Sequence, residues 1–395
     1  MEAVAVRTGY VPDPVALPGA PAWLSELRRN AFAEFERAGF PTPRDEAWRY
    51  TGIQSITGTA WAPAPATLSA EAPAGVRLRR LAEAPQRDVE AHLAKIAAPD
   101  GRAFAALNTA SLEDAYVLEI PAGAVIATPI ALAWTSAASH PEVSQPRLLV
   151  LAGERSQASV VESFAGTGRY FRNAVTEIAL SDAAILEHTT LQRESLSASH
   201  VHTISVRQGR ASRFTSHNVA LGSALARVDL DVRLDAEGAE CTLNGLFAGT
   251  GTQHLDNHTT IDHAKPHCTS RELYKGVMDG ASRGVFFGKI IVRPDAQKTD
   301  AIQTNKNLLL SREALVNSTP ALEIFADDVK CKHGSTTGQL DALALFYLRS
   351  RGIGEAEART LLTQAFAADV AERLSVPSVR EAVAEELARR LGGSE

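Results

Sequence analysis

The segments VRQGRA at residues 206–211 and LDAEGA at residues 234–239 decide how this sequence of 395 residues is read. Each ends an apolar run with a polar turn, and the two begin 28 residues apart. Working outward, the last apolar residue before such a turn recurs at Leu151, Leu180, Val206, Leu234, Ile261, Val292 and Phe325, with spacings of 29, 26, 28, 27, 31 and 33 residues. The strand after the turn gives a second series at Ala158, Ala183, Ala211, Ala239 and His267, with spacings of 25, 28, 28 and 28 residues.

This period predicts a mainly β fold with a β-solenoid core. A repeat near 28 residues has room for two strands and two turns, whereas a propeller blade needs roughly 40 to 45 residues. In a solenoid each coil contacts only its neighbours, and the stack of coils buries a continuous core. A β-sandwich stays open as an alternative, because strands separated by about 10 to 14 residues also fit that fold.

The sequence outside the repeats predicts helical regions at both ends. We expect a mixed, helical N-terminal region at residues 1–110, a β-helix core at 111–336 and a C-terminal helical domain at 337–395. In the C-terminal part, apolar residues at helical spacing predict helices near 340–352, 354–374 and 377–391, the last opened by Pro377. These helices are expected either to cap the solenoid or to dock a partner.

Composition narrows the class of protein. Hydrophobic residues make up 45% of the chain and charged residues 22%, which is typical of a soluble globular protein, and the net charge of −6 argues against nucleic acid or an anionic membrane as a partner. The three cysteines at 241, 268 and 331 form no disulfide framework. Neither a signal peptide nor a membrane span is apparent, so we expect a cytoplasmic protein.

One candidate site lies in the stretch from Ala326 to Gly334, where the strands give way to helices. If this stretch is extended, the two-residue period places Cys331 and His333 on the same face of a strand. Thiolate and imidazole are both ligands for transition metals. The alternative is ordinary packing of a small thiol beside a surface imidazole.

A second candidate is a cluster of four histidines. His254, His258, His263 and His267 lie among Asp256, Asp262 and Cys268 and could hold a transition metal if neighbouring coils converge. Their spacing of 4, 5 and 4 residues does not place them all on one strand face. A polar turn region of the solenoid explains most of them equally well.

Two other patterns resemble motifs found in enzymes. The run from Gly284 to Ile290 fails as a phosphate loop, because the glycine spacing is wrong and a strand follows Lys289. Asp327 and Asp328 could serve a carbohydrate-active β-helix enzyme, which we keep as an alternative function. Such an enzyme is usually exported, and the chain shows no export signal.

Several longer runs resemble the SufB/SufD family of iron–sulfur cluster assembly proteins. They are Asp256–His263, Lys265–Ser270, Lys275–Val277, Arg283–Ile290, Ala296–Ala301, Asn307–Ser311 and Pro320–Gly334, together with Glu46–Thr51 near the start and Leu345–Ile353 in the helical tail. Within the family the chain resembles the SufD branch, because it is shorter than SufB usually is and lacks extra N-terminal cysteines. Lys332 stands where serine is common in the family.

The resemblance implies a right-handed parallel β-helix that acts as a non-catalytic scaffold. It implies pairing with SufB through the late strands, and docking of the ATPase SufC on Leu345, Phe346, Tyr347, Leu348 and Arg351. It implicates His333, with Cys331 in the same segment, in nascent cluster formation. The cluster would be transient and held together with the partner, and no cofactor would stay on the chain alone. A homodimer in isolation and a SufB-type subunit that holds the cluster itself both remain open.

Overall fold

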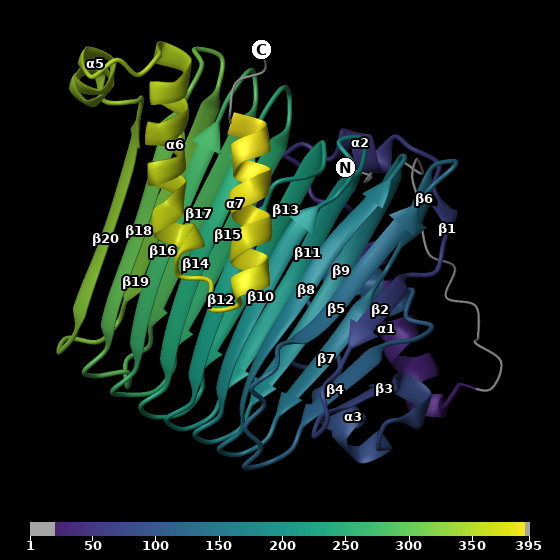
Figure 1. Cartoon of the computed structure of the whole chain (residues 1–395). Helices are drawn as coiled ribbons and strands as arrows, with labels where there is room; N and C mark the ends of the chain where they lie inside the picture. Colours follow the sequence, from purple (N-terminus) through teal and green to yellow (C-terminus); the bar gives the residue numbers. More distant parts are fainter. Residues whose placement is uncertain (1–19, 392–395) are drawn as a thin grey trace.

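The computed structural model describes residues 20–391, with the Leu391 side chain left aside (Figure 1). Of the predicted terminal regions, residues 1–19 and 392–395 fall outside the described part of the chain. The core is a parallel β-solenoid of about eight turns with helices at both ends of the chain, so the predicted fold class is confirmed.

Two sheets form the solenoid, and the chain crosses from one to the other at every turn. The first sheet has the order β19-β17-β15-β13-β11-β9-β7-β4-β3, with β6 beside β9 and β1 beside β6, and the second has the order β2-β5-β8-β10-β12-β14-β16-β18-β20. The regular strands are β7 Arg147–Ala152, β8 Gln157–Thr167, β9 Tyr170–Leu180, β10 Ile185–Arg193, β11 Ser199–Gln208, β12 Arg213–Ala220, β13 Leu225–Leu234, β14 Glu240–Gly249, β15 His254–His263, β16 Thr269–Met278, β17 Arg283–Val292, β18 Asp300–Leu309, β19 Leu315–Ile324 and β20 Lys330–Gly338. Because these strands pair in parallel along a stack, the β-sandwich alternative is wrong.

The strand register corrects several predicted repeat positions by one or two residues. Leu180, Leu234 and Val292 share one column, which also contains Ala152, Gln208, His263 and Ile324. The prediction had stopped at the last apolar residue before each turn. Gln208 and His263 are nevertheless fully buried, because Gln208 donates to the Ser212 hydroxyl and His263 Nε2 lies 2.9 Å from Ser270 Oγ.

A left-handed residue marks the corner of the successive coils from Arg155 to Lys298. Ala183, Ala211 and His267 have φ values of 56°, 51° and 59°, so three of the five predicted positions in the second series fall on this corner. Ala158 and Ala239 do not, since Ala158 lies within β8 and Ala239 follows the corner residue Gly238. The residue after each corner points inward and is small and buried, as at Ala184, Ser212 and Cys268.

The N-terminal elements cover one end and one face of the solenoid. They are α1 Ala22–Ala38, η1 Glu46–Trp48, α2 Gln54–Thr57, β1 Ala62–Pro63, β2 Thr67–Glu71, β3 Arg77–Arg80, η2 Leu81–Glu83, α3 Gln86–His92, α4 Ala103–Ala110, β4 Tyr116–Ile120, β5 Ile130–Ala137 and β6 Glu142–Ser144. Every residue of α4 from Phe104 to Ala110 is buried, because α4 lies between α1 and the strands β9 and β11. The domain boundaries at 110 and 336 stay predictions.

The C-terminal helices are α5 Ala342–Ser350, α6 Glu355–Ala371 and α7 Pro377–Leu391, the last beginning at the predicted proline. The helices α6 and α7 lie across the outer face of the second sheet (Figure 1). Their buried residues Ala367, Val370 and Val383 pack in one apolar cluster with Val219 and Leu246 of the sheet. These two helices therefore cover a flank of the solenoid and do not cap its end.

Candidate functional site

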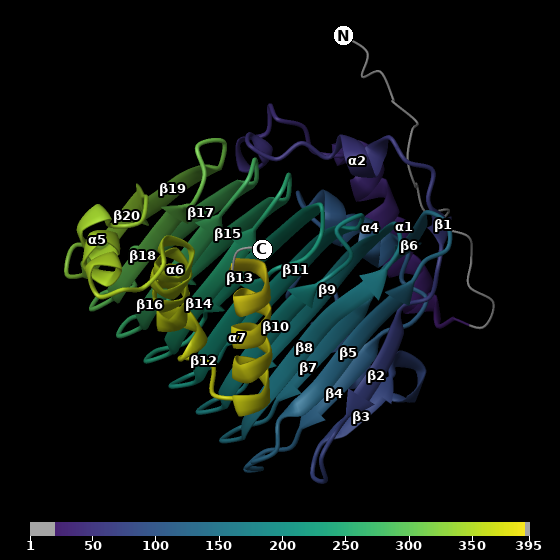
Figure 2. The same ribbon diagram turned by 45° about the horizontal axis from the view of Figure 1, so that its top comes forward.

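The end of the solenoid formed by β19 and β20 is the candidate site. Each strand is the outermost of its sheet and pairs on one side only, with β17 and β18 respectively (Figure 2). The two edge strands are tied together by a 2.7 Å hydrogen bond between Ser318 Oγ and Ser335 Oγ. An edge strand presents unpaired backbone N–H and C=O groups, which makes it a template for another strand.

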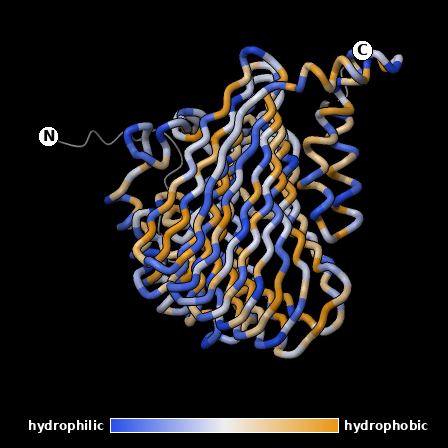
Figure 3. Tube along the Cα trace, turned by 90° about the vertical axis from the view of Figure 1, so that its left-hand side faces the viewer, coloured by the Kyte–Doolittle hydropathy of each residue, from blue (hydrophilic) through white to orange (hydrophobic). Residues whose placement is uncertain are grey.

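Side chains at this end are mostly open to solvent. All residues of β20 except Cys331 are exposed, and Leu315, Ile324 and Phe325 are 41%, 41% and 60% exposed. Hydrophobic and hydrophilic residues are interspersed along the strands viewed from this side (Figure 3). The last rung therefore offers apolar contacts as well as backbone hydrogen bonds.

Cys331 and His333 both lie in β20, and their environments differ. In the parallel register Cys331 pairs with Ala301 and His333 pairs with Gln303. Cys331 is half-buried and packs against the apolar core, whereas His333 is exposed. Partial burial raises the pKa of the Cys331 thiol. Because the thiolate is the form that binds metals, this geometry favours His333 over Cys331 as the available ligand.

Asp327 and Asp328 belong to the corner that precedes β20. Gln297 Nε2 donates to Asp327 Oδ1 at 3.0 Å, and Asp328 forms an ion pair with Lys298. Asp328 also donates its backbone N–H to Gln297 Oε1. Both carboxylates are thus engaged in holding one turn against the next, and this arrangement gives no support to a carbohydrate-cleaving carboxylate pair.

The four histidines of the second candidate are not brought together. His254 and His258 lie on the outer face of β15, on either side of Asp256, whereas His263 alternates to the inner face and is buried. His267 is a corner residue. Among residues 20–391, no group of three or more histidine, cysteine, aspartate or glutamate side chains is placed to hold a metal ion.

Arg227 contacts Asp256 and His258, whereas His254 Nε2 lies 2.9 Å from Thr51 Oγ1. Arg227 Nη1 lies 2.7 Å from Asp256 Oδ2 and 3.1 Å from His258 Nε2, and the guanidinium stacks 3.7 Å from the Trp48 ring centroid. Thr51 Oγ1 also donates to Asp256 Oδ2 at 2.6 Å. Although burial opposes it, His258 and Arg227 hold the pKa of Asp256 well below its usual range. This cluster fastens the segment Glu46–Thr51 to the sheet.

The helix α5 is the second exposed feature near the open end. Asp341 caps it by accepting the Leu343 backbone N–H at 2.8 Å, yet none of its residues is buried. Leu343, Phe346 and Tyr347 are 78%, 71% and 57% exposed, and the Arg351 guanidinium lies 5.1 Å from the Tyr347 ring centroid. An amphipathic helix with its apolar side chains in water is typical of an interaction surface. The predicted docking residues Leu345 and Leu348 of this helix are half-buried.

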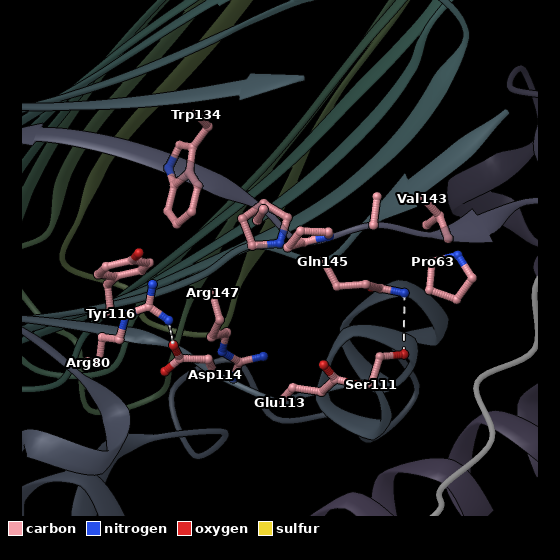
Figure 4. Close-up of a pocket in the computed structure, with 14 residues that line it drawn as sticks. Pro63, Arg80, Ser111, Glu113, Asp114, Tyr116, Trp134, Val143, Gln145 and Arg147 are labelled. Carbon is pink, nitrogen blue, oxygen red and sulfur yellow. Dashed lines mark hydrogen bonds and ion pairs between the residues drawn. The ribbon is translucent and has the colours of Figure 1, made fainter. Parts of the chain in front are cut away.

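A cavity of about 320 Å³ lies at the opposite end of the solenoid (Figure 4). Several of its polar groups are paired with one another: Arg80 forms an ion pair with Asp114, and Gln145 Nε2 donates to Ser111 Oγ at 3.4 Å. Trp134 lines it and donates its indole N–H to Glu162. No histidine or cysteine lines this cavity, so it is unsuited to iron–sulfur chemistry.

Two buried residues behind His333 escaped the sequence analysis. Gln303 pairs with His333 one rung inward, and Glu272 pairs with Gln303 one rung further, at intervals of 30 and 31 residues. Gln303 Nε2 donates to Glu272 Oε2 at 2.7 Å. The signal that could have found them is the coil period, counted back from His333.

Comparison with known families decides the relationship of the chain. Residues 134–366 match the family described as "SUF system FeS cluster assembly, SufBD core domain". The chain belongs to the SufB/SufD family. The matched region runs from within β5 to α6, and it includes Cys331, His333 and α5.

Individual SufB/SufD relatives agree with this assignment. A SufBD family iron–sulfur cluster assembly protein of Mycobacterium tuberculosis is 32% identical over 387 residues, covering 92% of this chain and 94% of the relative. One from Synechocystis is 38% identical over 288 residues, covering 70% of this chain and 64% of the relative, slightly under two thirds. The iron–sulfur cluster assembly protein SufD of Escherichia coli is 37% identical over 243 residues, covering 61% and 57%.

Membership places the chain among proteins of iron–sulfur cluster assembly in the Suf system. Between residues 20 and 391, no helix combines the length and the apolar character needed to cross a lipid bilayer.

Proposed function

We propose that this chain is a non-catalytic, cytoplasmic scaffold subunit of a Suf assembly complex. Its last rung pairs with a SufB-type partner, its helix α5 docks the ATPase SufC, and His333 contributes to the nascent cluster at the interface with SufB. The observation that carries the proposal is that an exposed His333 lies on a terminal rung whose two edge strands are each paired on one side only.

The edge strands support a partner that adds its own strands. β-strand addition supplies main-chain hydrogen bonds, and alternate side chains supply specificity. The apolar side chains Leu315, Ile324 and Phe325 add surface that a partner would bury. In an isolated chain the same edge invites a second copy, so a homodimer is the expected competing assembly.

His333 supports a cluster that is transient and shared. Neutral imidazole is an iron ligand, but one imidazole cannot hold a cluster. Cys331 lies on the same face but is half-buried, with its thiol pKa raised. The remaining ligands must therefore come from the partner, so the isolated chain is expected to retain no cluster after anaerobic reconstitution.

The test of the cluster role is His333→Ala in the chain co-expressed with SufB and SufC. Recovery of the complex should be unchanged, and iron, sulfide and visible charge-transfer absorbance should fall together. His140→Ala is the matched control, because its side chain is 61% exposed and lies away from the open end. A normal cluster content in the His333→Ala complex would contradict the proposal.

The docking role of α5 has a separate test. Phe346→Asp should abolish recovery of SufC in a pull-down and leave recovery of SufB intact, since Phe346 is 71% exposed and no residue of α5 is fully buried. Leu196→Asp is the control, because Leu196 is 58% exposed in the turn between β10 and β11. Equal recovery of SufC with both variants would remove α5 from the interface.

A further inference from the structure

The inner face of β20 lies over the interior of the solenoid. Cys331 packs against the core, Ser335 Oγ contacts Ser318, and Thr337 Oγ1 accepts from Asn307 Nδ2 at 3.3 Å. Since these three alternate along one strand, His333 between Cys331 and Ser335 has its Cα–Cβ bond on the same inner face. His333 therefore stands above its register neighbour Gln303, one strand spacing away.

Gln303 is held in one orientation from behind. It is fully buried, and its Nε2 donates to Glu272 Oε2 at 2.7 Å. Glu272 Oε2 accepts this hydrogen bond whether the carboxyl group is ionised or protonated on its other oxygen, so the Nε2 end of the amide faces Glu272. The amide oxygen, Gln303 Oε1, is left buried and without a hydrogen-bond partner among the described residues.

The opposite sheet is shaped to accommodate this amide. Gly288 of β17 has no side chain there, and a Cβ at that position would lie 2.3 Å from Gln303 Nε2. No positive φ is recorded at Gly288, so the glycine is required by the close approach of Gln303 and not by its own backbone conformation. The Gln303 side chain therefore occupies a place that is kept open for it.

The acceptor Gln303 Oε1, unpaired within residues 20–391 and one rung below His333, could orient the imidazole ring of that candidate ligand. A histidine that binds metal through one ring nitrogen almost always donates its other N–H to a carboxylate, carbonyl or water, which fixes its tautomer and orientation. Gln303 Oε1 is a carbonyl oxygen of this kind. It lies on the core side of His333, so the second ring nitrogen would be directed toward the open end.

We propose that Gln303, oriented by Glu272, is a positioning residue for His333. When the partner covers the last rung, Gln303 Oε1 accepts the N–H of one imidazole nitrogen, and the other nitrogen is presented to iron at the interface. This inference rests on the proposed function of His333. It adds two buried residues, from two deeper coils, to a site that otherwise consists of surface groups.

The test uses the full chain in complex with SufB and SufC. Gln303→Leu should leave recovery of the complex unchanged and lower iron affinity of the site by about 10- to 100-fold, as loss of such outer contacts typically does. The measurement is the rate at which a chelator removes the cluster anaerobically, followed by visible absorbance. This rate is measured only on clusters that have formed, so a simple loss of folded complex would not change it.

Two variants of Glu272 keep the test independent of misfolding at residue 303. Glu272→Leu releases the Gln303 amide and should accelerate cluster loss, whereas Glu272→Gln keeps an acceptor and should restore the native rate. Equal rates for these two variants, or a native rate in Gln303→Leu, would overturn the positioning role. If His333→Ala also leaves the cluster content unchanged, then the proposed function itself has failed.

Discussion

Glu272 makes the stability of the protein depend on pH in a way that Glu272→Gln should remove. Glu272 is 3% exposed as a whole residue, and its carboxyl group forms no ion pair within residues 20–391. Burial raises its pKa from 4.5 to about 7. Between these two values the folded chain keeps the proton while the unfolded chain has lost it.

The sign and size of the effect follow from proton linkage. The folded state binds more protons than the unfolded state in this window, so the free energy of unfolding falls as the pH rises from 4.5 to about 7. At about 1.4 kcal/mol for each pH unit, the loss amounts to about 3 kcal/mol and is complete above pH 7. Glutamine has no proton to lose and keeps the hydrogen bond with Gln303.

Glu272→Gln should therefore equal the native protein near pH 4.5 and exceed its stability by up to about 3 kcal/mol at pH 8. Urea denaturation followed by tryptophan fluorescence at pH 5, 6, 7 and 8 measures the difference, with the slope against urea checked for constancy. Glu240→Gln is the control, because its side chain is 53% exposed beside Arg213. A difference that stays flat over this pH range, or a less stable variant at pH 8, would refute the reasoning.

Three further perturbations test other parts of the structure. Gly245→Ala should destabilise by about 1–3 kcal/mol in chemical denaturation, because a Cβ there would lie 2.1 Å from the Tyr274 ring, whereas Gly334→Ala meets nothing within 4 Å and should be neutral. Arg227→Met should lower the free energy of unfolding by about 3–5 kcal/mol, because it leaves Asp256 buried without its guanidinium partner. Limited trypsin digestion should then cut faster at Arg49, and an unchanged digestion rate would show that Arg227 does not hold the Glu46–Thr51 segment. Maleimide should label one thiol of the native protein, Cys331, and three thiols in denaturant, because Cys241 and Cys268 are buried; rapid native labelling of a second thiol would contradict that packing.

The repeat could be predicted because the coils are in step over most of their length. The predicted repeat positions were wrong by two residues where a polar residue occupies the core position, as at Gln208 and His263. From local hydropathy alone, such polar residues are predicted to belong to the turn. They can be buried because the fold brings hydrogen-bond partners, Ser212 and Ser270, next to them. The helix beginning at Pro377 needed no such partner, so it was predictable from local sequence alone.

In the candidate site, too, some features follow from local sequence and others only from contacts that the fold creates. The common face of Cys331 and His333 follows from strand parity within three residues. Gln303 lies 30 residues before His333 and Glu272 lies 31 before Gln303, whereas other coils differ by a few residues, so strand parity alone cannot supply these contacts. Likewise, Trp48 and Arg227 meet across 179 positions of sequence, and no local pattern relates them.

The placement of α6 and α7 has a consequence for how the solenoid opens. A stack of coils frays from its ends, because each coil is held only by its neighbours. The two helices share an apolar cluster with Val161, Leu191, Val219, Leu246 and Val277, and so tie the second-sheet strands β8, β10, β12, β14 and β16 into one cooperative unit. The strands β19 and β20 contribute no residue to this cluster with α6 and α7. The rung that carries His333 is therefore the part of the core expected to exchange its amide hydrogens first, and a partner strand would be the element that completes its folding.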